Sequence, residues 1–255
     1  SLLQTREWLI GKRGYFGCSY SMGQLWKELC KDESNREIAC LYPTGASAAV
    51  YLAEEHAVQT HTAIPSQSHW IKGLATLLGE AIKPLDPKGG WPIAIACPPF
   101  GVKNKEQTTN DPEIAGIELQ GPKGLRDLEA RRILTAHQFC AEKTFALASP
   151  AIGFSGSKDI ELFRQELIKN NWLEAVIELP AGIHLGTNIG GLLLILSHKR
   201  KDKDKIAIIS GESLIPKGKR KIGSTELDPA AITELVEMIK KPVDSKICKL
   251  VDAEE

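Results

Sequence analysis

Short apolar runs alternate with windows of helical spacing along most of the chain. The apolar runs predict buried strands, and the windows with apolar residues three and four positions apart predict amphipathic helices. We expect seven strands, at residues 37–41, 58–64, 93–96, 144–151, 173–179, 190–198 and 206–210. We expect helices at residues 22–30, 49–56, 68–82, 125–142, 157–170 and 228–240. This alternation is typical of βαβ units and predicts an α/β fold with a mostly parallel sheet and helices on both faces.

The same pattern predicts one domain over residues 1–255. Residues 1–36 are expected to form a helical lead-in, residues 37–210 the core sheet, and residues 211–255 a helical extension. Two polar stretches are predicted as loops, at residues 83–92 and 102–124. The first loop contains three prolines and two glycines. The second is long enough to suggest a functional or mobile segment, because long loops inside compact domains are uncommon.

Composition limits the possible classes of function but does not identify a single one. Lys plus Arg and Asp plus Glu balance at 32 each, so the whole chain offers no net charge to nucleic acid. A local basic face could still bind DNA. Six cysteines without a CxxC pair predict buried thiols and no metal site. The absence of a long apolar run and of a signal-peptide pattern predicts a cytoplasmic protein outside the membrane.

The clearest candidate for chemistry is the turn after the strand at 93–96, which reads Cys97, Pro98, Pro99 and Phe100. Two consecutive prolines cannot continue a strand, so they fix a rigid turn at its carboxyl end. Ligands of open α/β sheets bind at that edge. Phe100 could therefore stack on a flat ring. The alternative is that the prolines only end the strand and that Phe100 belongs to the core.

This turn resembles the N/D/S-P-P-Y/F/W motif of amino-methyltransferases that act on adenine N6, cytosine N4 or glutamine. The resemblance implies that Cys97 occupies the position of a hydrogen-bond acceptor for the target amino group. The Pro98 carbonyl would accept a second hydrogen bond, Pro99 would complete the turn, and Phe100 would stack on a flipped base.

A second segment is more specific. Residues 173–182 read LEAVIELPAG and are followed by Thr187, Asn188 and Ile189 before an apolar strand. This order resembles the modification subunits of type I restriction–modification systems. The resemblance implies a Rossmann-like class I methyltransferase fold, S-adenosylmethionine as cofactor and adenine N6 in DNA as target. It also implies a specificity subunit and a restriction subunit as partners.

The cofactor positions depart from the pattern of that family, which has a D-P-x-C/x-G-S/x-G turn after the first strand. The matching positions here are Tyr42, Pro43, Thr44, Gly45, Ala46, Ser47 and Ala48. Tyr42 replaces the acid, and alanines replace both glycines that let the backbone approach the cofactor. The second strand offers Ala63 where an acid for the ribose is expected. Asp86 could supply the acid after the third strand, although a solvated loop aspartate is the alternative.

Cys97 is a further departure, because a thiol accepts hydrogen bonds more weakly than an amide or carboxylate oxygen. The sequence therefore predicts an N6-adenine DNA methyltransferase-like domain in which methyl transfer is weakened or lost. The alternative is a pseudo-methyltransferase that keeps the fold to bind DNA or protein. Methylation of a protein glutamine is a third possibility, and the LEAVI segment argues against it.

Overall fold

The computed structural model describes most of the sheet and the helices around it. The described residues are 20–33, 36–42, 48–49, 51–53, 56–61, 82–86, 88–98, 100, 117–183, 189–200, 205–211 and 226–253. The helix predicted at 68–82 lies outside them except for Ile82, which is in a strand, and most of the polar loop predicted at 102–124 also lies outside them. Every helix within the described part is too short or too polar to span a bilayer.

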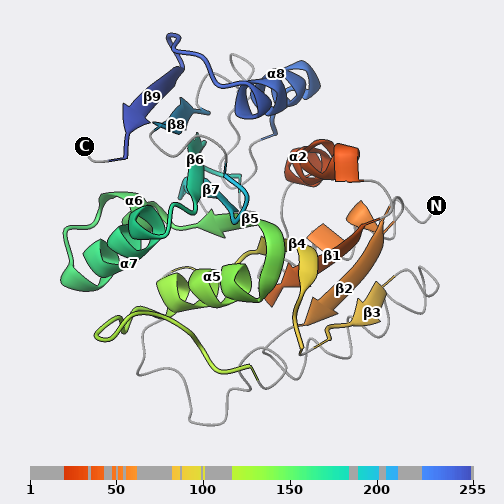
Figure 1. The fold of residues 1–255 in the computed structure, drawn as a ribbon. Helices are drawn as coiled ribbons and strands as arrows, with labels where there is room; N and C mark the ends of the chain where they lie inside the picture. The colour runs from red at the N-terminus through yellow and green to blue at the C-terminus, as the bar shows by residue number, and fades with distance from the viewer. Residues whose placement is uncertain are drawn as a thin grey trace.

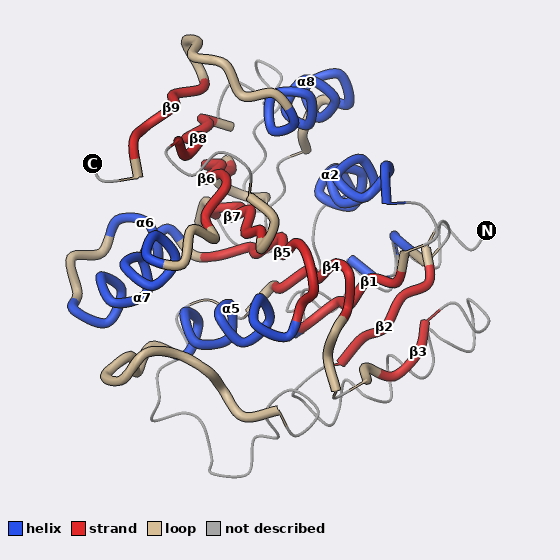
Figure 2. The backbone as a smooth tube through the Cα atoms, in the orientation of Figure 1, coloured by secondary structure: helices blue, strands red, loops and turns tan. Residues whose placement is uncertain are grey.

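The centre of the structure is a nine-stranded sheet with the order β3-β2-β1-β4-β5-β7-β6-β8-β9 (Figures 1 and 2). The strands are β1 (Glu37–Leu41), β2 (Ala57–His61), β3 (Ile82–Pro84), β4 (Trp91–Ala96), β5 (Cys140–Ala148), β6 (Leu173–Leu179), β7 (Gly191–Ser197), β8 (Lys205–Ser210) and β9 (Cys248–Asp252). Five strand pairs are parallel and three, involving β7 or β9, are antiparallel. The predicted mostly parallel sheet is confirmed.

Helices cover both faces of this sheet, and each face has its own apolar core. The helices are α2 (Tyr20–Cys30), the short η1 (Lys31–Glu33), α5 (Leu128–Phe139), α6 (Pro150–Phe154), α7 (Lys158–Lys169) and α8 (Pro229–Lys240). One core joins the sheet to α2 and α8, and the other joins it to α5, α6 and α7. Figure 1 shows α2 beside α8, well separated from α5.

Two hydrogen bonds join the start of α2 to the segment that leads into α8. The Ser21 amide donates to the Glu226 carboxylate at 2.8 Å, across 205 positions of sequence. The Leu227 amide donates to the Ser21 hydroxyl at 2.8 Å. The predicted helical lead-in and the predicted extension therefore pack together on one face of the sheet.

The sheet has nine strands rather than the seven expected. β3 was missed because it is three residues long and ends in Pro84, which an edge strand tolerates. β9 lies in the stretch predicted as a helical extension, so the sheet continues to Asp252 instead of ending at Ser210. The helix predicted at 125–142 ends at Phe139 and passes directly into β5, with no glycine or proline to mark its end.

A glycine pair between β3 and β4 packs against the end of α5. Gly89 has φ +72°, and a Cβ there would lie 2.8 Å from the Phe139 ring and 3.0 Å from its carbonyl oxygen. The neighbouring Gly90 has φ +79° but nothing within 4 Å of such a Cβ. Its amide donates to the same Phe139 carbonyl at 2.7 Å.

Gly89→Ala is expected to lower the free energy of unfolding by about 2 kcal/mol, because it combines left-handed backbone strain with a steric clash. Gly90→Ala is the matched control and carries only the backbone strain, about 1 kcal/mol. Urea unfolding of both variants measures the difference. Equal losses for the two variants would contradict the close packing of Gly89 on Phe139.

Candidate functional site

The carboxyl ends of β1 and β4 lie side by side at the edge where the sequence predicts the site. Leu41 pairs with Ala96 in the parallel ladder. The Cys97 amide then donates to the Leu41 carbonyl at 3.2 Å. Tyr42 and Cys97, which the sequence assigns to the cofactor turn and the catalytic turn, thus follow directly from neighbouring strands. The structure brings these two predicted positions together.

The catalytic turn is largely closed to solvent. Cys97 is 1% exposed and belongs to the core on the α2 side of the sheet. Pro98 is also buried. Phe100 is partly buried and packs against the same core. The roles of these residues toward an amino group or a flipped base stay predictions.

Tyr42 turns to the opposite face of the sheet, toward α5. It is 2% exposed and has φ 70°, a left-handed backbone conformation that is uncommon for a tyrosine. Its phenol donates to the Arg132 carbonyl at 2.9 Å. The Arg132 guanidinium carbon lies 5.7 Å from the centre of the Tyr42 ring. Burial raises the pKa of the phenol, against the opposing effect of the Arg132 charge, so Tyr42 is a neutral residue with structural contacts.

Asp86, the candidate acid after β3, is exposed and takes part in its own turn. Its carboxylate accepts from the Lys88 amide at 2.9 Å, and its backbone amide donates to the Gln59 side chain at 2.6 Å. A carboxylate that accepts from an amide two residues later is a common turn-stabilising arrangement. These contacts give Asp86 a local structural task, and its role toward a cofactor stays a prediction.

The remaining predicted site residues lie outside the described residues. They are Pro43, Thr44, Gly45, Ala46, Ser47, Ala63 and Pro99. The backbone is helical at Ala48, the last matching position of the cofactor turn, and at Ala49. A helical stretch thus comes after β1, as the sequence predicts, and residues 43–47 between the two lie outside the described residues.

Three polar residues near this edge were missed in the sequence, and two of them lie on α5. Glu129 is 7% exposed and accepts from both the amide and the hydroxyl of Ser149, the residue that follows β5. Arg132, one turn later, is 6% exposed and lies beside Tyr42. The signal was present, because both residues share helix faces with apolar core residues such as Leu128 and Ile133. Charged side chains at such positions are rarely buried without a specific partner.

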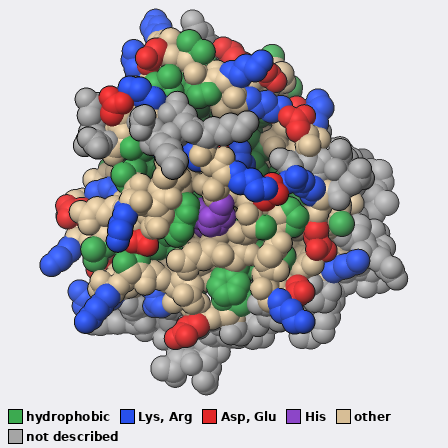
Figure 3. Space-filling view, viewed as in Figure 1, with side chains coloured by type: hydrophobic (Ala, Val, Ile, Leu, Met, Phe, Trp, Pro, Cys, Tyr) green, Lys and Arg blue, Asp and Glu red, His purple; other side chains and the backbone are tan. Residues whose placement is uncertain are grey.

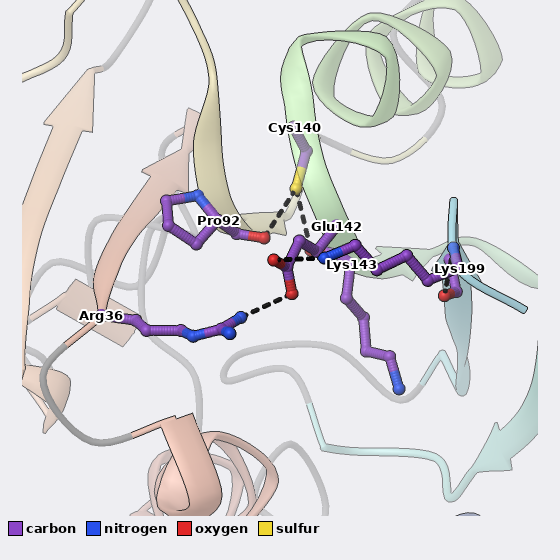
Figure 4. Close-up of polar contacts among 7 residues, drawn as sticks. Arg36, Pro92, Cys140, Glu142, Lys143 and Lys199 are labelled. Carbon is purple, nitrogen blue, oxygen red and sulfur yellow. Dashed lines mark hydrogen bonds and ion pairs between the residues drawn. The ribbon is translucent and has the colours of Figure 1, made fainter.

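Charged groups at the amino-terminal edge of the sheet are paired instead (Figure 4). Glu142, near the start of β5, binds Arg36 at 2.5 Å and Lys199 at 2.6 Å. Lys199 and Arg36 together lower the pKa of this carboxyl. Cys140 donates its thiol to the carbonyl oxygens of Pro92 and Lys143. Among the described residues of this edge, the charged groups around Glu142 are therefore held in ion pairs.

The described surface shows no block of one charge sign in the view of Figure 3, where lysine, arginine, aspartate and glutamate side chains are interspersed. The described residues also contain no group of three or more His, Cys, Asp or Glu side chains that could hold a metal ion. The predicted buried thiols are confirmed at Cys30, Cys40, Cys97, Cys140 and Cys248.

Comparisons with known proteins agree on the fold. A type I restriction–modification system methyltransferase subunit from Streptococcus thermophilus superposes with a TM-score of 0.76 at 16% identity, covering 99% of this chain and 59% of that one. A Listeria monocytogenes protein described as a class I S-adenosylmethionine-dependent methyltransferase gives a TM-score of 0.63 at 14% identity, covering 94% of this chain and 76% of that one. The chain therefore has the Rossmann-like class I methyltransferase fold that the sequence predicts.

Sequence comparison identifies the family. The Type I restriction enzyme MpnII methylase subunit of Mycoplasma pneumoniae is 24% identical over 174 residues, which cover 66% of this chain and 31% of that protein. The chain thus spans about a third of this relative's length. The sequence profile of the N-6 DNA methylase family matches residues 80–255, more than half of the chain. This chain belongs to the N-6 DNA methylase family.

Proposed function

We propose that this chain is an adenine-N6 DNA methyltransferase-like domain of the kind found in type I modification subunits, and that its methyl transfer is weakened or lost. Family membership and the similarity to two type I methyltransferase subunits support the first part. The position of the Pro-Pro-Phe turn at the carboxyl end of β4, beside β1, agrees with it, because ligands bind at this edge of open α/β sheets.

The state of Cys97 carries the second part of the proposal. A thiol is a weak acceptor, and this one lies 1% exposed within an apolar core. An amino group that approaches the turn could therefore donate only a weak hydrogen bond to the sulfur of Cys97. Raising the nucleophilicity of such an amine needs a well-placed acceptor oxygen, which position 97 does not supply.

S-adenosylmethionine is the cofactor that family membership implies, and the described residues do not fit it well. At the position of the family's acid, the Tyr42 phenol donates to the Arg132 carbonyl instead of presenting a carboxylate. A cation, Arg132, lies beside it, and a cation repels the positive sulfonium of this cofactor.

The proposed partners follow from the relatives. DNA is the proposed substrate, and a specificity subunit and a restriction subunit are the proposed protein partners. The balanced charge of the chain gives weak nonspecific attraction to DNA, so we expect binding to DNA to depend on such partners.

The second candidate function is a pseudo-methyltransferase that serves as a DNA- or protein-binding module. Tyr42 favours it, because a residue at the predicted cofactor turn makes contacts with Arg132 that tie α5 to the segment after β1. In this case the fold is retained for its surface rather than for its cleft.

Calorimetric titration with S-adenosylmethionine and S-adenosylhomocysteine, followed by transfer of a labelled methyl group to unmethylated DNA, tests the proposal. We expect no saturable binding in the micromolar range, which corresponds to about −8 kcal/mol. Micromolar binding together with rapid methylation would contradict the weakened state. Absence of binding up to millimolar cofactor, in folded protein, would favour the pseudo-methyltransferase.

Cys97→Asn is expected to raise residual methyl transfer by about tenfold, the effect of one good hydrogen bond to the reacting amine. Cys97→Ser, which also restores an oxygen acceptor, should raise it less. Cys97→Ala is the control without an acceptor and should not exceed the unmodified chain. A gain in Cys97→Ala equal to that in Cys97→Asn would show that acceptor strength at position 97 is not limiting.

A further inference from the structure

The most unusual polar group in the described structure is the guanidinium of Arg132. This side chain is 6% exposed, and its Nη1 atom has no hydrogen-bond partner among the residues that the structure describes. A buried, incompletely paired guanidinium is strongly destabilising, because its charge has lost water without gaining an acceptor. The neighbouring Arg131 differs, since its guanidinium donates to the Leu119 carbonyl.

The surroundings of Arg132 place it at the predicted site. Its guanidinium lies beside the ring of Tyr42, the residue that follows β1 and begins the predicted cofactor turn. One helical turn earlier, Glu129 ties α5 to Ser149 at the end of β5. α5 thus fixes Arg132 below the carboxyl edge of the sheet. The aromatic ring contributes cation–π attraction but accepts no hydrogen bond in the plane of the guanidinium.

We propose that Arg132 is an anion-binding residue at the carboxyl edge of β1, which takes a carboxylate or phosphate group of the ligand bound there. A guanidinium presents its donors in a planar fork that matches the paired oxygens of both groups. The family pattern has an acid at position 42, and this chain has a neutral tyrosine with a cation next to it. The edge therefore favours a ligand with a negative group. Binding of an anion by Arg132 does not require methyl transfer.

The test compares the unmodified chain with Arg132→Met, and with Arg131→Met as the matched control on the same helix. Three probes are titrated by calorimetry and thermal unfolding at constant ionic strength. Inorganic phosphate supplies a phosphate, S-adenosylhomocysteine supplies a carboxylate on an adenosine, and 5′-methylthioadenosine supplies the adenosine without the carboxylate. We expect Arg132→Met to weaken binding of phosphate or S-adenosylhomocysteine by about tenfold. Binding of 5′-methylthioadenosine and all binding by Arg131→Met should stay unchanged.

The outcomes separate this inference from the proposed function. Loss of phosphate binding alone identifies a phosphate site, and loss of S-adenosylhomocysteine binding alone identifies a carboxylate site. If the cofactor analogue does not bind but phosphate binding depends on Arg132, the anion site stands without a methyltransferase cofactor. Equal binding of every probe to the unmodified chain and to Arg132→Met, or no binding of phosphate and S-adenosylhomocysteine at millimolar concentration, would overturn the inference. Should Arg132→Met fail to fold, Arg132→Lys, which keeps the charge without the fork, is expected to show the same selective weakening.

Discussion

Glu129→Ala is expected to lower the free energy of unfolding by about 3 kcal/mol, because it leaves two buried donors of Ser149 without their charged acceptor. The Glu129 carboxylate is 7% exposed and joins α5 to the residue after β5. Its removal therefore loosens the helix that carries Arg132 as well as the end of β5. Chemical denaturation at neutral pH measures the loss.

Two matched variants identify the cause of that loss. Glu129→Gln keeps one acceptor oxygen and should lose about half as much stability. Ser149→Ala removes the hydroxyl that donates to Glu129 and leaves the amide. In a double-mutant cycle, the losses of stability from Glu129→Ala and Ser149→Ala should therefore be strongly non-additive, because the two residues share this contact. Additive effects, or a Glu129→Ala variant as stable as the unmodified chain, would mean that the contact contributes little.

Acidification below pH 6.5 is expected to destabilise the chain through His137. Burial, together with the charge of His198, lowers the pKa of His137 to about 3, so the folded chain keeps this imidazole neutral. Its ring is 0% exposed, stacks on His198 at 3.9 Å between ring centres, and meets the edge of Trp172 at 5.0 Å. An unfolded chain binds a proton there with a pKa near 6.5. The stabilisation is therefore complete above about pH 6.5 and is lost as the pH falls toward 3, by a few kcal/mol in all.

Other groups also respond to acid, so the measurement is a difference between variants. The paired carboxyls of Glu142 and Asp32 have lowered pKa values, chiefly through Lys199 and Lys240, and both lose their ion pairs on protonation. His137→Leu keeps these groups and removes the imidazole. Its free energy of unfolding should fall less steeply between pH 6.5 and 4 than that of the unmodified chain. Parallel curves for the two proteins would exclude His137 as a source of the acid sensitivity.

The sequence predicted the parts of the fold that have strong local signals. The sequence predicts helices that begin at Ser157 and at Asp228, and both residues accept the hydrogen bonds of an N-cap. The apolar runs predicted the bounds of β6 and β7 to within one residue. The sequence did not predict the two edge strands, because β3 and β9 are short and contain proline or charged residues. It also misplaced the end of α5, because no glycine or proline separates this helix from β5.

The site was less predictable, because its geometry depends on contacts between distant segments. The residues around Tyr42 do not predict its left-handed backbone conformation. They also do not predict that its phenol donates to the carbonyl of Arg132, 90 positions later in the sequence. The motif predicted the place of Cys97 at the strand end and the cysteine pattern predicted a buried thiol, but neither indicated that it lies in the α2-side core. Arg132 shares a helix face with apolar core residues, and the packing of α5 under the sheet edge buries it.

The hydrogen bonds between Ser21 and the segment before α8 have a consequence for synthesis on the ribosome. α2 buries Trp26 and Leu25 completely, and α8 is one of the helices that it contacts. Residues 226–240 leave the ribosome long after α2 does, so the apolar face of α2 lacks this neighbour while the residues between them are synthesised. Nascent chains that stop before Glu226 should therefore be prominent chaperone clients, because incompletely packed apolar surfaces are what chaperones protect.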